Sequence, residues 1–507
     1  MTIAGAESSG NRFSQILHGL AKDSAIYGLG AIAGRLVAII TAPILTRIFA
    51  PADYGVISLI QLALSLAVIL AGLNIGSGIA YYFFLDESES ARRRTLTTGF
   101  GALAILAGII ASAVALFAPQ ISQLMDLRLE GPVVGHDLVR YLRIGALGMF
   151  FALMQTGFQS LLRLLRQPRR YLAVELVALS VNLSTVMVLV VWLRIGIEGV
   201  FWAGVSGSIA GFLCGLAMTY GRFGITVSWV TLGLIVGYAV PQVPGVLINW
   251  AQTQIGRVFI NYYSTLSEQG LYSIAFVLAS ILAIALTAFR LAYDPFALSI
   301  MRRGDAPVTY ARVYTFFCAA FALLTGIVIA FAKPILQVLT PPIYHGAYAT
   351  VPYLAVAAFY MGANNIVATG IWLSGRTIFT SYAQGIAFIA LVAANLVFVP
   401  WLGGKGAAIG YLCGTLAQSL AYYRFAQNLR PIPYRYWRAH GLVAAVLAIG
   451  VLQAQLVATM NFVPSLILGF VTSAIIVLTC IIVGLPTDDR RAVRLWIRAR
   501  YPTARAH

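Results

Sequence analysis

Long apolar runs separated by short polar segments fill nearly the whole chain. The apolar runs are continuous, and most reach the roughly 20 residues that a helix needs to cross a hydrocarbon core of about 30 Å. Because a backbone exposed to lipid must satisfy its own hydrogen bonds, such runs predict helices, whereas a β-barrel would show short alternating strands. The pattern indicates an all-α, polytopic membrane protein. Fourteen transmembrane helices are expected, at residues 24–49, 56–84, 96–118, 138–161, 171–193, 198–221, 231–262, 270–298, 313–332, 351–373, 380–402, 405–425, 440–459 and 462–484.

Two sequence features recur in the two halves of the chain. Residues 53–58 and 268–273 both read acidic residue, any residue, Gly, two residues, Ser, and are 215 positions apart. The loops at 196–199 and 403–406 are rich in glycine and lie 207 positions apart. Glycines at a spacing of four put small residues on one helix face. Such glycines occur in both halves, and they suggest a repeat register about two helical turns from the one that the loops suggest. They are Gly207, Gly211 and Gly215 in one half, and Gly406, Gly410 and Gly414 in the other.

The repeat predicts two lobes of six helices each, covering about 24–222 and 230–425. An even number of helices per lobe gives both lobes the same orientation, so they are expected to be parallel repeats related by an axis along the membrane normal. Two further helices at 440–484 follow the second lobe. A mostly polar segment, 1–23, precedes the first helix and a basic tail, 485–507, ends the chain. The first of these segments lacks the apolar stretch of a cleavable signal peptide. The helix at 231–262 is expected to bend, because it contains two prolines.

Composition and charge agree with a membrane protein and predict its topology. Of the 507 residues, 60% are hydrophobic and 10% are charged, whereas soluble domains carry roughly 25% charged residues. The net charge is +18, but an excess of Lys and Arg in a membrane protein marks cytoplasmic loops rather than a nucleic-acid site. If the N-terminus is cytoplasmic, 24 of the 34 basic residues fall inside. Both termini are therefore expected in the cytoplasm, with the basic tail near anionic headgroups, and no nucleic-acid partner is expected.

No catalytic or metal-binding constellation is visible in the sequence. The four cysteines lie inside apolar runs, where they are typical small core residues, and the five histidines are scattered without metal-ligand spacing. The phosphate-cradling loop G-x-x-x-x-G-K-[ST] does not occur, which argues against an intrinsic ATPase. The chain is predicted to be a transporter rather than an enzyme, with no cofactor and no metal site. The sequence leaves the coupling ion open.

Basic side chains inside the apolar runs are the candidate functional residues. A charge at a helix centre costs roughly 2.5–3.5 kcal/mol on insertion scales. Four arginines remain inside the predicted helices once the basic residues near helix ends are assigned to loops: Arg35, Arg143, Arg257 and Arg290. Only two acidic residues, Glu175 and Asp294, lie in the same regions. This excess of positive charge predicts a water-filled cationic cavity for an anionic ligand. Phosphate suits it, because the guanidinium presents its donors as a planar fork.

Structural roles compete with this interpretation at most positions. Arg290 is one turn from Asp294 and could form a local ion pair, Arg143 could extend toward the interface, and Arg257 could stand at the outer end of its helix. Arg35, near mid-membrane, has no acidic residue within one turn and is the strongest candidate. Three asparagines could either line the cavity or form hydrogen bonds between helices: Asn74, Asn249 and Asn365.

Several of these stretches together resemble a known family. Residues 45–55 read Leu-Thr-Arg-Ile-Phe-Ala-Pro-Ala-Asp-Tyr-Gly, residues 342–347 read Pro-Ile-Tyr-His-Gly-Ala, and 395–406 contains an Asn, a Pro and a Gly-x-x-Gly pattern. With residues 257–273, their order and spacing are similar to the Wzx-type polysaccharide flippase branch of the multidrug/oligosaccharidyl-lipid/polysaccharide exporter superfamily. The resemblance covers nearly the whole chain. It departs at Gly256, where the family often has an acidic residue before the arginine of helix 7.

The resemblance implies a flippase that acts by alternating access. Its substrate would be an undecaprenyl-pyrophosphate-linked oligosaccharide, the repeat unit of O-antigen, capsule or exopolysaccharide. The flippase would move it from the inner to the outer leaflet of a bacterial cytoplasmic membrane, with the pyrophosphate meeting the arginines. Polysaccharide polymerase and chain-length proteins are candidate partners.

Three alternative functions remain open. They are a peptidoglycan lipid-precursor flippase, a multidrug/ion antiporter of the same fold, and a membrane polysaccharide polymerase or ligase. An antiporter should have intramembrane carboxylates and a polymerase a long periplasmic loop. This chain instead has an arginine excess and a modest loop at about 119–137.

Overall fold

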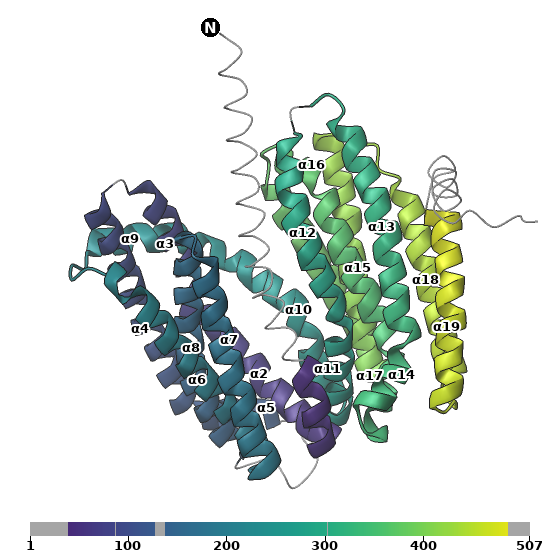
Figure 1. The fold of residues 1–507 in the computed structure, drawn as a ribbon, viewed down its shortest axis with the longest axis horizontal. Helices are drawn as coiled ribbons and strands as arrows, with labels where there is room; N and C mark the ends of the chain where they lie inside the picture. The colour runs from purple at the N-terminus through teal and green to yellow at the C-terminus, as the bar shows by residue number, and fades with distance from the viewer. Residues whose placement is uncertain (1–38, 87, 127–136, 302, 485–507) are drawn as a thin grey trace, which may run out of the picture. The chain divides into compact units, whose positions relative to one another are not determined.

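The computed structural model describes residues 39–86, 88–126, 137–301 and 303–484, and within these ranges it contains helices and no strand (Figure 1). Twelve helical stretches in this part of the chain are long and apolar enough to cross a membrane. The protein is therefore a multi-pass helical membrane protein, as predicted. The expected first helix, 24–49, lies mostly outside the described residues, and its described part is a helix over Ile39–Ile48.

Interresidue contacts divide the chain into two compact units. The first unit consists of the described residues up to Ser273 together with Thr287–Tyr293. The second consists of Ile274–Leu286 and the described residues from Asp294 onward. This division differs from the lobe boundary expected between residues 222 and 230, because the segment between 229 and 273 groups with the first unit. Contact units and sequence repeats need not coincide, so the two predicted lobes and the appended pair at 440–484 stay predictions.

The first unit is a bundle of helices around apolar cores, of which two are large. Helix α8 packs against α6 and α7, α6 against α4 and α2, α9 against α3, and α10 against α2. Fully buried side chains such as Ile60, Leu142, Leu161 and Ile235 fill the cores. The elements are α2 (Pro51–Gly72), α3 (Ile75–Leu85), α4 (Glu89–Leu116), α5 (Ala118–Asp126), α6 (Asp137–Leu164), α7 (Pro168–Val186), the π-helix η1 (Met187–Trp192), α8 (Ile197–Thr219), η2 (Tyr220–Arg222), α9 (Trp229–Ala239), η3 (Val240–Gln242) and α10 (Val243–Tyr263).

The second unit is built around α15, most of whose residues are buried. Helices α13, α17 and α18 pack against it, and α19 packs against α13, α14 and α18. Helices α11 (Leu266–Ala279) and α12 (Ile281–Ser299) contain residues of both units. The remaining elements are α13 (Ala306–Ala330), α14 (Ala332–Leu339), η4 (Pro342–Ala349), α15 (Val351–Val367), α16 (Thr369–Leu373), α17 (Ile378–Leu429), α18 (Tyr436–Leu456), α19 (Phe462–Thr479) and the π-helix η5 (Cys480–Gly484).

Helix α17 covers two predicted helices, 380–402 and 405–425. Its 52 residues contain one non-helical position, Gly403, with φ 52° and ψ −126°. A Cβ at Gly406 would collide with the carbonyl oxygen of Phe398, so the chain folds back on itself immediately after Gly403. Two transmembrane arms therefore meet at a tight corner, in agreement with the predicted pair, while the total of fourteen helices remains a prediction.

Contacts around the two hairpin corners favour a repeat register of 207 residues. Gly196, with φ 78°, stands where Gly403 stands in the second hairpin. The glycine three residues later packs against the preceding arm in both cases, Gly199 against Val190 and Gly406 against Phe398. Gly207 likewise corresponds to Gly414, since both meet the preceding arm about three turns further from the corner. These contacts favour the register suggested by the loops over the one suggested by the glycines at a spacing of four.

The repeated turn at 53–58 and 268–273 begins a helix in each case. Asp53 accepts a hydrogen bond from the Ala50 backbone N–H at 3.0 Å at the start of α2. Thr265 Oγ1 accepts one from the Glu268 N–H at 3.2 Å at the start of α11. Both contacts satisfy N–H groups that a helix start leaves without intrahelical partners.

Within the first unit these two helix starts pack against each other reciprocally. A Cβ at Gly55 would collide with the carbonyl of Leu266, and a Cβ at Gly270 would collide with the carbonyl of Pro51. Ser273 Oγ donates a hydrogen bond to Ser58 Oγ at 2.9 Å. Each contact joins positions related by the 215-residue repeat, so the pairing has the mutual geometry of an isologous interface. Gly55, Ser58, Gly270 and Ser273 are called the α2–α11 seam below.

Candidate functional site

Arg257 lies in α10, and its guanidinium has neighbours on three helices. Its Nη1 donates a hydrogen bond to Oε1 of Gln254, one turn earlier, at 3.1 Å. It also interacts electrostatically with Tyr54 of α2 and Tyr272 of α11. The Nε atom is enclosed by protein, so part of the charged group is removed from solvent. The amide and the two phenols are uncharged at neutral pH, and none of these three neighbours neutralises the guanidinium.

These neighbours place Arg257 beside the α2–α11 seam. Tyr54 directly precedes Gly55, and Tyr272 directly precedes Ser273. Gln269, next to Gly270, is fully buried, and its side-chain amide has no hydrogen-bond partner in the described part of the chain. An unsatisfied buried amide costs about 1–3 kcal/mol. The seam therefore combines a close helix crossing with polar groups that a change of conformation or a ligand could satisfy.

Two membrane-spanning segments of the first unit are interrupted. Leu73 and Asn74 adopt left-handed φ values of 40° and 56° between α2 and α3. Asparagine tolerates this conformation better than most residues. Helices α9 and α10 are joined by the short η3, which contains Pro241, so the bend expected in the 231–262 helix is confirmed. Asn74 Nδ2 donates a hydrogen bond to Gln242 Oε1 at 3.1 Å, and this bond joins the two interruptions.

Polar and aromatic groups gather around this junction. Ser77 Oγ donates to the Asn74 carbonyl at 2.8 Å, and Gln242 Nε2 donates to the Tyr238 carbonyl at 3.0 Å. The rings of Tyr81 and Tyr238 stack with centroids 4.4 Å apart. Discontinuous helices are a recurring feature of transporter binding sites, because their unwound backbone can serve a ligand. The junction offers amide, hydroxyl and aromatic groups on one part of the fold.

The other predicted residues of the first unit have different surroundings. Arg143 is exposed, and its Nε donates to the carbonyl of Ala115 in the last turn of α4 at 3.3 Å. A cation at a helix C-terminus is favourable because the final carbonyls lack intrahelical partners. Arg290 is exposed on α12, and Asn249 is exposed on α10. The structure therefore gives Arg143 a structural contact, and Asn74 is bonded separately to Gln242.

Asn365 of α15 makes an interhelical hydrogen bond in the second unit. Its Nδ2 donates to Oδ1 of Asp294 at 3.2 Å. Of the two alternatives for Asn365, the hydrogen bond between helices is thus observed. Arg35, the strongest sequence candidate, lies outside the described residues. Among the described residues there is no cluster of three or more His, Cys, Asp or Glu side chains able to hold a metal ion.

Sequence reasoning missed the side chains that hold the predicted ones in place. Gln254 forms a hydrogen bond with Arg257, and Gln242 forms one with Asn74. Both glutamines are uncharged, so they do not stand out in an apolar segment as an arginine does. A spacing of three residues could have suggested the Gln254–Arg257 pair. Gln242 is 168 positions from Asn74, and one sequence gives no signal for that pairing. Its position beside Pro241, at the expected bend, was the available hint.

Comparisons with known proteins agree with this fold. A family model described as polysaccharide biosynthesis protein matches residues 44–292. A protein of the Lsg locus of Haemophilus influenzae is 22% identical over 402 residues, which cover 75% of this chain and 94% of the relative. Residues 44–292 include α2 to α11, and so contain both the seam and the junction of interrupted helices.

Solved structures share the fold at low sequence identity. The lipid II flippase MurJ in an inward closed conformation superposes with a TM-score of 0.69 at 11% identity, covering 89% of this chain and 98% of that one. The Vibrio cholerae MATE transporter VcmN, solved as a point mutant, superposes with a TM-score of 0.55 at 14% identity, covering 84% and 99%. The chain is therefore similar in sequence to polysaccharide biosynthesis proteins over residues 44–292 and shares its fold with these transporters, which supports the resemblance noted in the sequence.

Proposed function

We propose that this protein moves an undecaprenyl-pyrophosphate-linked oligosaccharide from the inner to the outer leaflet of a bacterial cytoplasmic membrane. The polysaccharide biosynthesis family match and the fold shared with a lipid II flippase support a lipid-linked substrate. The headgroup passes through a polar cavity while the lipid tail stays in the bilayer. Membrane potential or an ion gradient supplies the energy. Both termini are cytoplasmic, and polysaccharide polymerase and chain-length proteins are candidate partners.

The observation that carries the proposal is the environment of Arg257. Its guanidinium lies in a membrane-spanning segment, next to the amide of Gln254 and the phenols of Tyr54 and Tyr272. A charge kept in such a place is expensive and marks a functional site by default. A pyrophosphate presents the oxygens that a guanidinium binds through two parallel hydrogen bonds. The junction of Asn74, Gln242, Tyr81 and Tyr238 supplies neutral groups that suit a sugar.

The remaining predicted site residues are expected to contribute unequally to substrate binding. Arg35 joins Arg257 as the second expected contact to the pyrophosphate. Arg143 and Asn365 each have a structural partner, so their contribution to the cavity is secondary. Arg290 and Asn249 are exposed, and they would contact the headgroup at the wall of the proposed cavity.

A peptidoglycan lipid-precursor flippase is the second candidate function. The higher TM-score with MurJ than with the MATE transporter VcmN favours it over a drug antiporter. Deleting the gene separates the two flippase functions, because the lipid-linked intermediate that accumulates has a different sugar composition in each case.

Arg257 variants test the proposed role directly in a gene-deletion strain. Arg257→Ala should insert normally and lower surface polysaccharide per folded molecule by about tenfold or more, as expected for losing a charge-assisted contact worth at least about 1.4 kcal/mol. Arg257→Lys should restore only part of the output, because an ammonium cannot reproduce the fork. Arg143→Ala is the matched control, and it should keep nearly full output. Undiminished export by Arg257→Ala would refute the assigned role.

A further inference from the structure

A basic cavity lies at one end of the first unit, away from the seam and the junction. It has a volume of about 670 Å³ and is lined by Arg93 of α4, Arg170 of α7 and the segment 217–222, which contains Arg222. The same end carries Arg92, Arg94, Arg163, Arg166 and Arg169 in the sequence. Its acidic residues, Asp86, Glu87 and Glu89, are close together in the sequence. The sequence predicts this end to face the cytoplasm.

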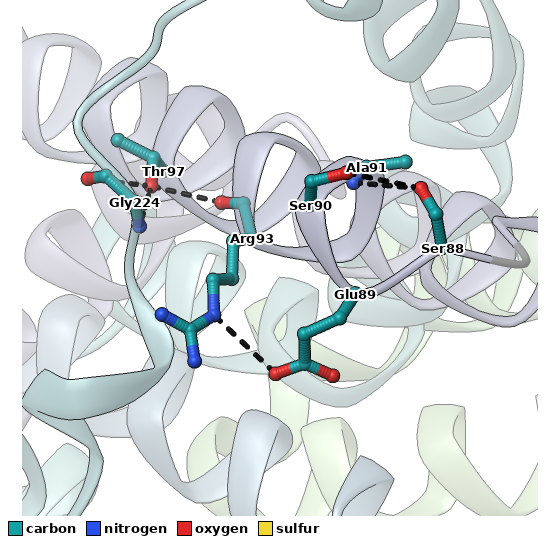
Figure 2. A network of polar contacts seen from close by, with 7 residues as sticks. All are labelled: Ser88, Glu89, Ser90, Ala91, Arg93, Thr97 and Gly224. Atoms are coloured by element: carbon teal, nitrogen blue, oxygen red, sulfur yellow. Dashed lines mark hydrogen bonds and ion pairs between the residues drawn. The ribbon is translucent and has the colours of Figure 1, made fainter.

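The three arginines that line the cavity retain donors for a ligand. Figure 2 shows Arg93, whose Nε contacts Glu89 Oε1 at 3.3 Å while Nη1 and Nη2 have no partner in the described chain. Arg170 uses Nη1 for Gln167, at 3.1 Å, and for the Met218 carbonyl, at 3.4 Å. Arg222 makes no hydrogen bond or ion pair with the described residues. Two of the three guanidinium groups thus have no carboxylate partner there.

Two threonine side chains of α4 hold the loop that follows the cavity wall. Thr97 Oγ1 accepts a hydrogen bond from the Gly224 N–H at 2.8 Å, as Figure 2 shows. Thr98 Oγ1 accepts one from the Ser228 N–H at 3.1 Å. These two bonds fix the loop that follows Arg222 against the helix that carries Arg93. The positions of two of the basic residues are therefore set by the fold.

Apolar and aromatic side chains are exposed in the cavity wall and in the segment that follows it in the chain. Tyr220 lines it and is 73% exposed, and Trp229, at the start of α9, is 83% exposed. Ile225 and Val230 are also exposed. Exposed Trp and Tyr at the ends of membrane-spanning helices mark the level of the lipid headgroups. The cavity therefore opens where a headgroup can enter it while acyl chains lie along apolar surface.

We propose that this cavity binds the phosphate headgroup of a membrane-resident anionic glycerophospholipid. Basic pockets between transmembrane helices on the cytoplasmic side suit anionic headgroups, and guanidinium suits phosphate. The adjacent apolar surface favours a lipid over a free anion. The proposal is independent of the proposed transport function, because it concerns a cavity lined by other residues.

Native mass spectrometry of the purified full-length protein tests this site. Phosphatidylglycerol should form a saturable complex, and phosphatidylcholine with the same acyl chains should bind at least about tenfold more weakly. Arg170→Ala/Arg222→Ala should weaken phosphatidylglycerol binding about tenfold or more, since each arginine near anionic headgroups contributes on this scale. The matched control, Arg94→Ala/Arg169→Ala, removes the same charge from exposed positions outside the cavity and should change the affinity less than about twofold.

Several outcomes would overturn the assignment. Equal weakening in both double variants would show diffuse surface charge instead of a site. Equal binding of the two phospholipids would exclude headgroup recognition. Displacement by inorganic pyrophosphate would indicate a free-anion site, and preferential displacement by undecaprenyl phosphate would indicate the carrier lipid. If the double variant does not fold, Arg222→Ala alone decides the question, because the Arg222 side chain makes no hydrogen bond or ion pair with the described residues and its loss should affect folding least.

Discussion

The sequence locates charged residues inside apolar segments, but it does not show what surrounds them. Hydrophobicity located Arg143 and Arg257 as unusual charges, and it could not tell them apart. The structure separates them, because Arg143 donates to the Ala115 carbonyl at a helix end while Arg257 lies among Gln254, Tyr54 and Tyr272. Ala115, Tyr54 and Tyr272 are far in the sequence from the arginines that they approach, so only the packed fold shows which groups surround each one.

Lys333 is a basic residue whose structural role the sequence does not reveal. In α14 it is buried, and its Nζ donates to the carbonyls of Val457, Ala458 and Met460 where α18 ends. It also lies 5.4 Å from the ring of Tyr348. Burial lowers the pKa of Lys333, and the three carbonyl oxygens favour its charged form.

Lys333→Met should lower the free energy of unfolding by about 2–3 kcal/mol. The substitution keeps the apolar stem but leaves three carbonyls without their charged donor, and hydrogen bonds to charged groups contribute about 1.5–3 kcal/mol each. Thermal unfolding of the purified protein measures the effect. Lys405→Met, at an exposed position beside the Gly403 corner, is the control. Equal stability of the two variants would mean that the carbonyl contacts contribute nothing.

Helices were predictable because their apolar runs are long, while their ends and interruptions were not. The helix expected at 96–118 begins instead at Glu89, since Ser88 caps its N-terminus by accepting from the Ala91 N–H. A helix starts at its cap, several residues before its first apolar side chain. Pro241 indicated one interruption in the sequence. The left-handed pair at Leu73 and Asn74 contains neither proline nor glycine, and Gly72, which directly precedes it, was not recognised as a signal.

Gly270→Ala should destabilise the start of α11. In an open helix, replacing Gly by Ala stabilises by roughly 1 kcal/mol. At Gly270 the new methyl group would collide with the Pro51 carbonyl, and overpacking costs about 1–3 kcal/mol. The collision outweighs the propensity gain, so the midpoint of thermal unfolding should fall.

Gly237→Ala supplies the comparison for this prediction. Gly237 lies in α9, and no atom lies within 4 Å of the place that a methyl group would take there, so its substitution should be neutral or stabilising. A Gly270→Ala protein as stable as Gly237→Ala would show that the close approach of α2 and α11 is not maintained in the membrane.

At the scale of the whole molecule, the repeated turn is visible in both the sequence and the structure. The sequence located the twin turns at 53–58 and 268–273, and it could not show that they touch. In the structure the Gly of each turn meets the first residue of the other helix, and the two serines share a hydrogen bond. The two copies of the repeated turn therefore pack against each other inside the first unit, a relation that the sequence pattern alone did not reveal.

If transport requires the α2–α11 seam to separate, a covalent bond across it should stop export. The hydroxyls of Ser58 and Ser273 are 2.9 Å apart, so cysteines at these positions have the proximity that a disulfide needs. The experiment uses Ser58→Cys/Ser273→Cys in a protein whose four native cysteines are replaced. Oxidation should abolish surface polysaccharide in proportion to the crosslinked fraction, and a reductant should restore it. Each single cysteine variant, which cannot form the bond, should stay active under both conditions. Full export by completely crosslinked protein would show that the seam stays closed throughout the transport cycle and that the moving contact lies elsewhere.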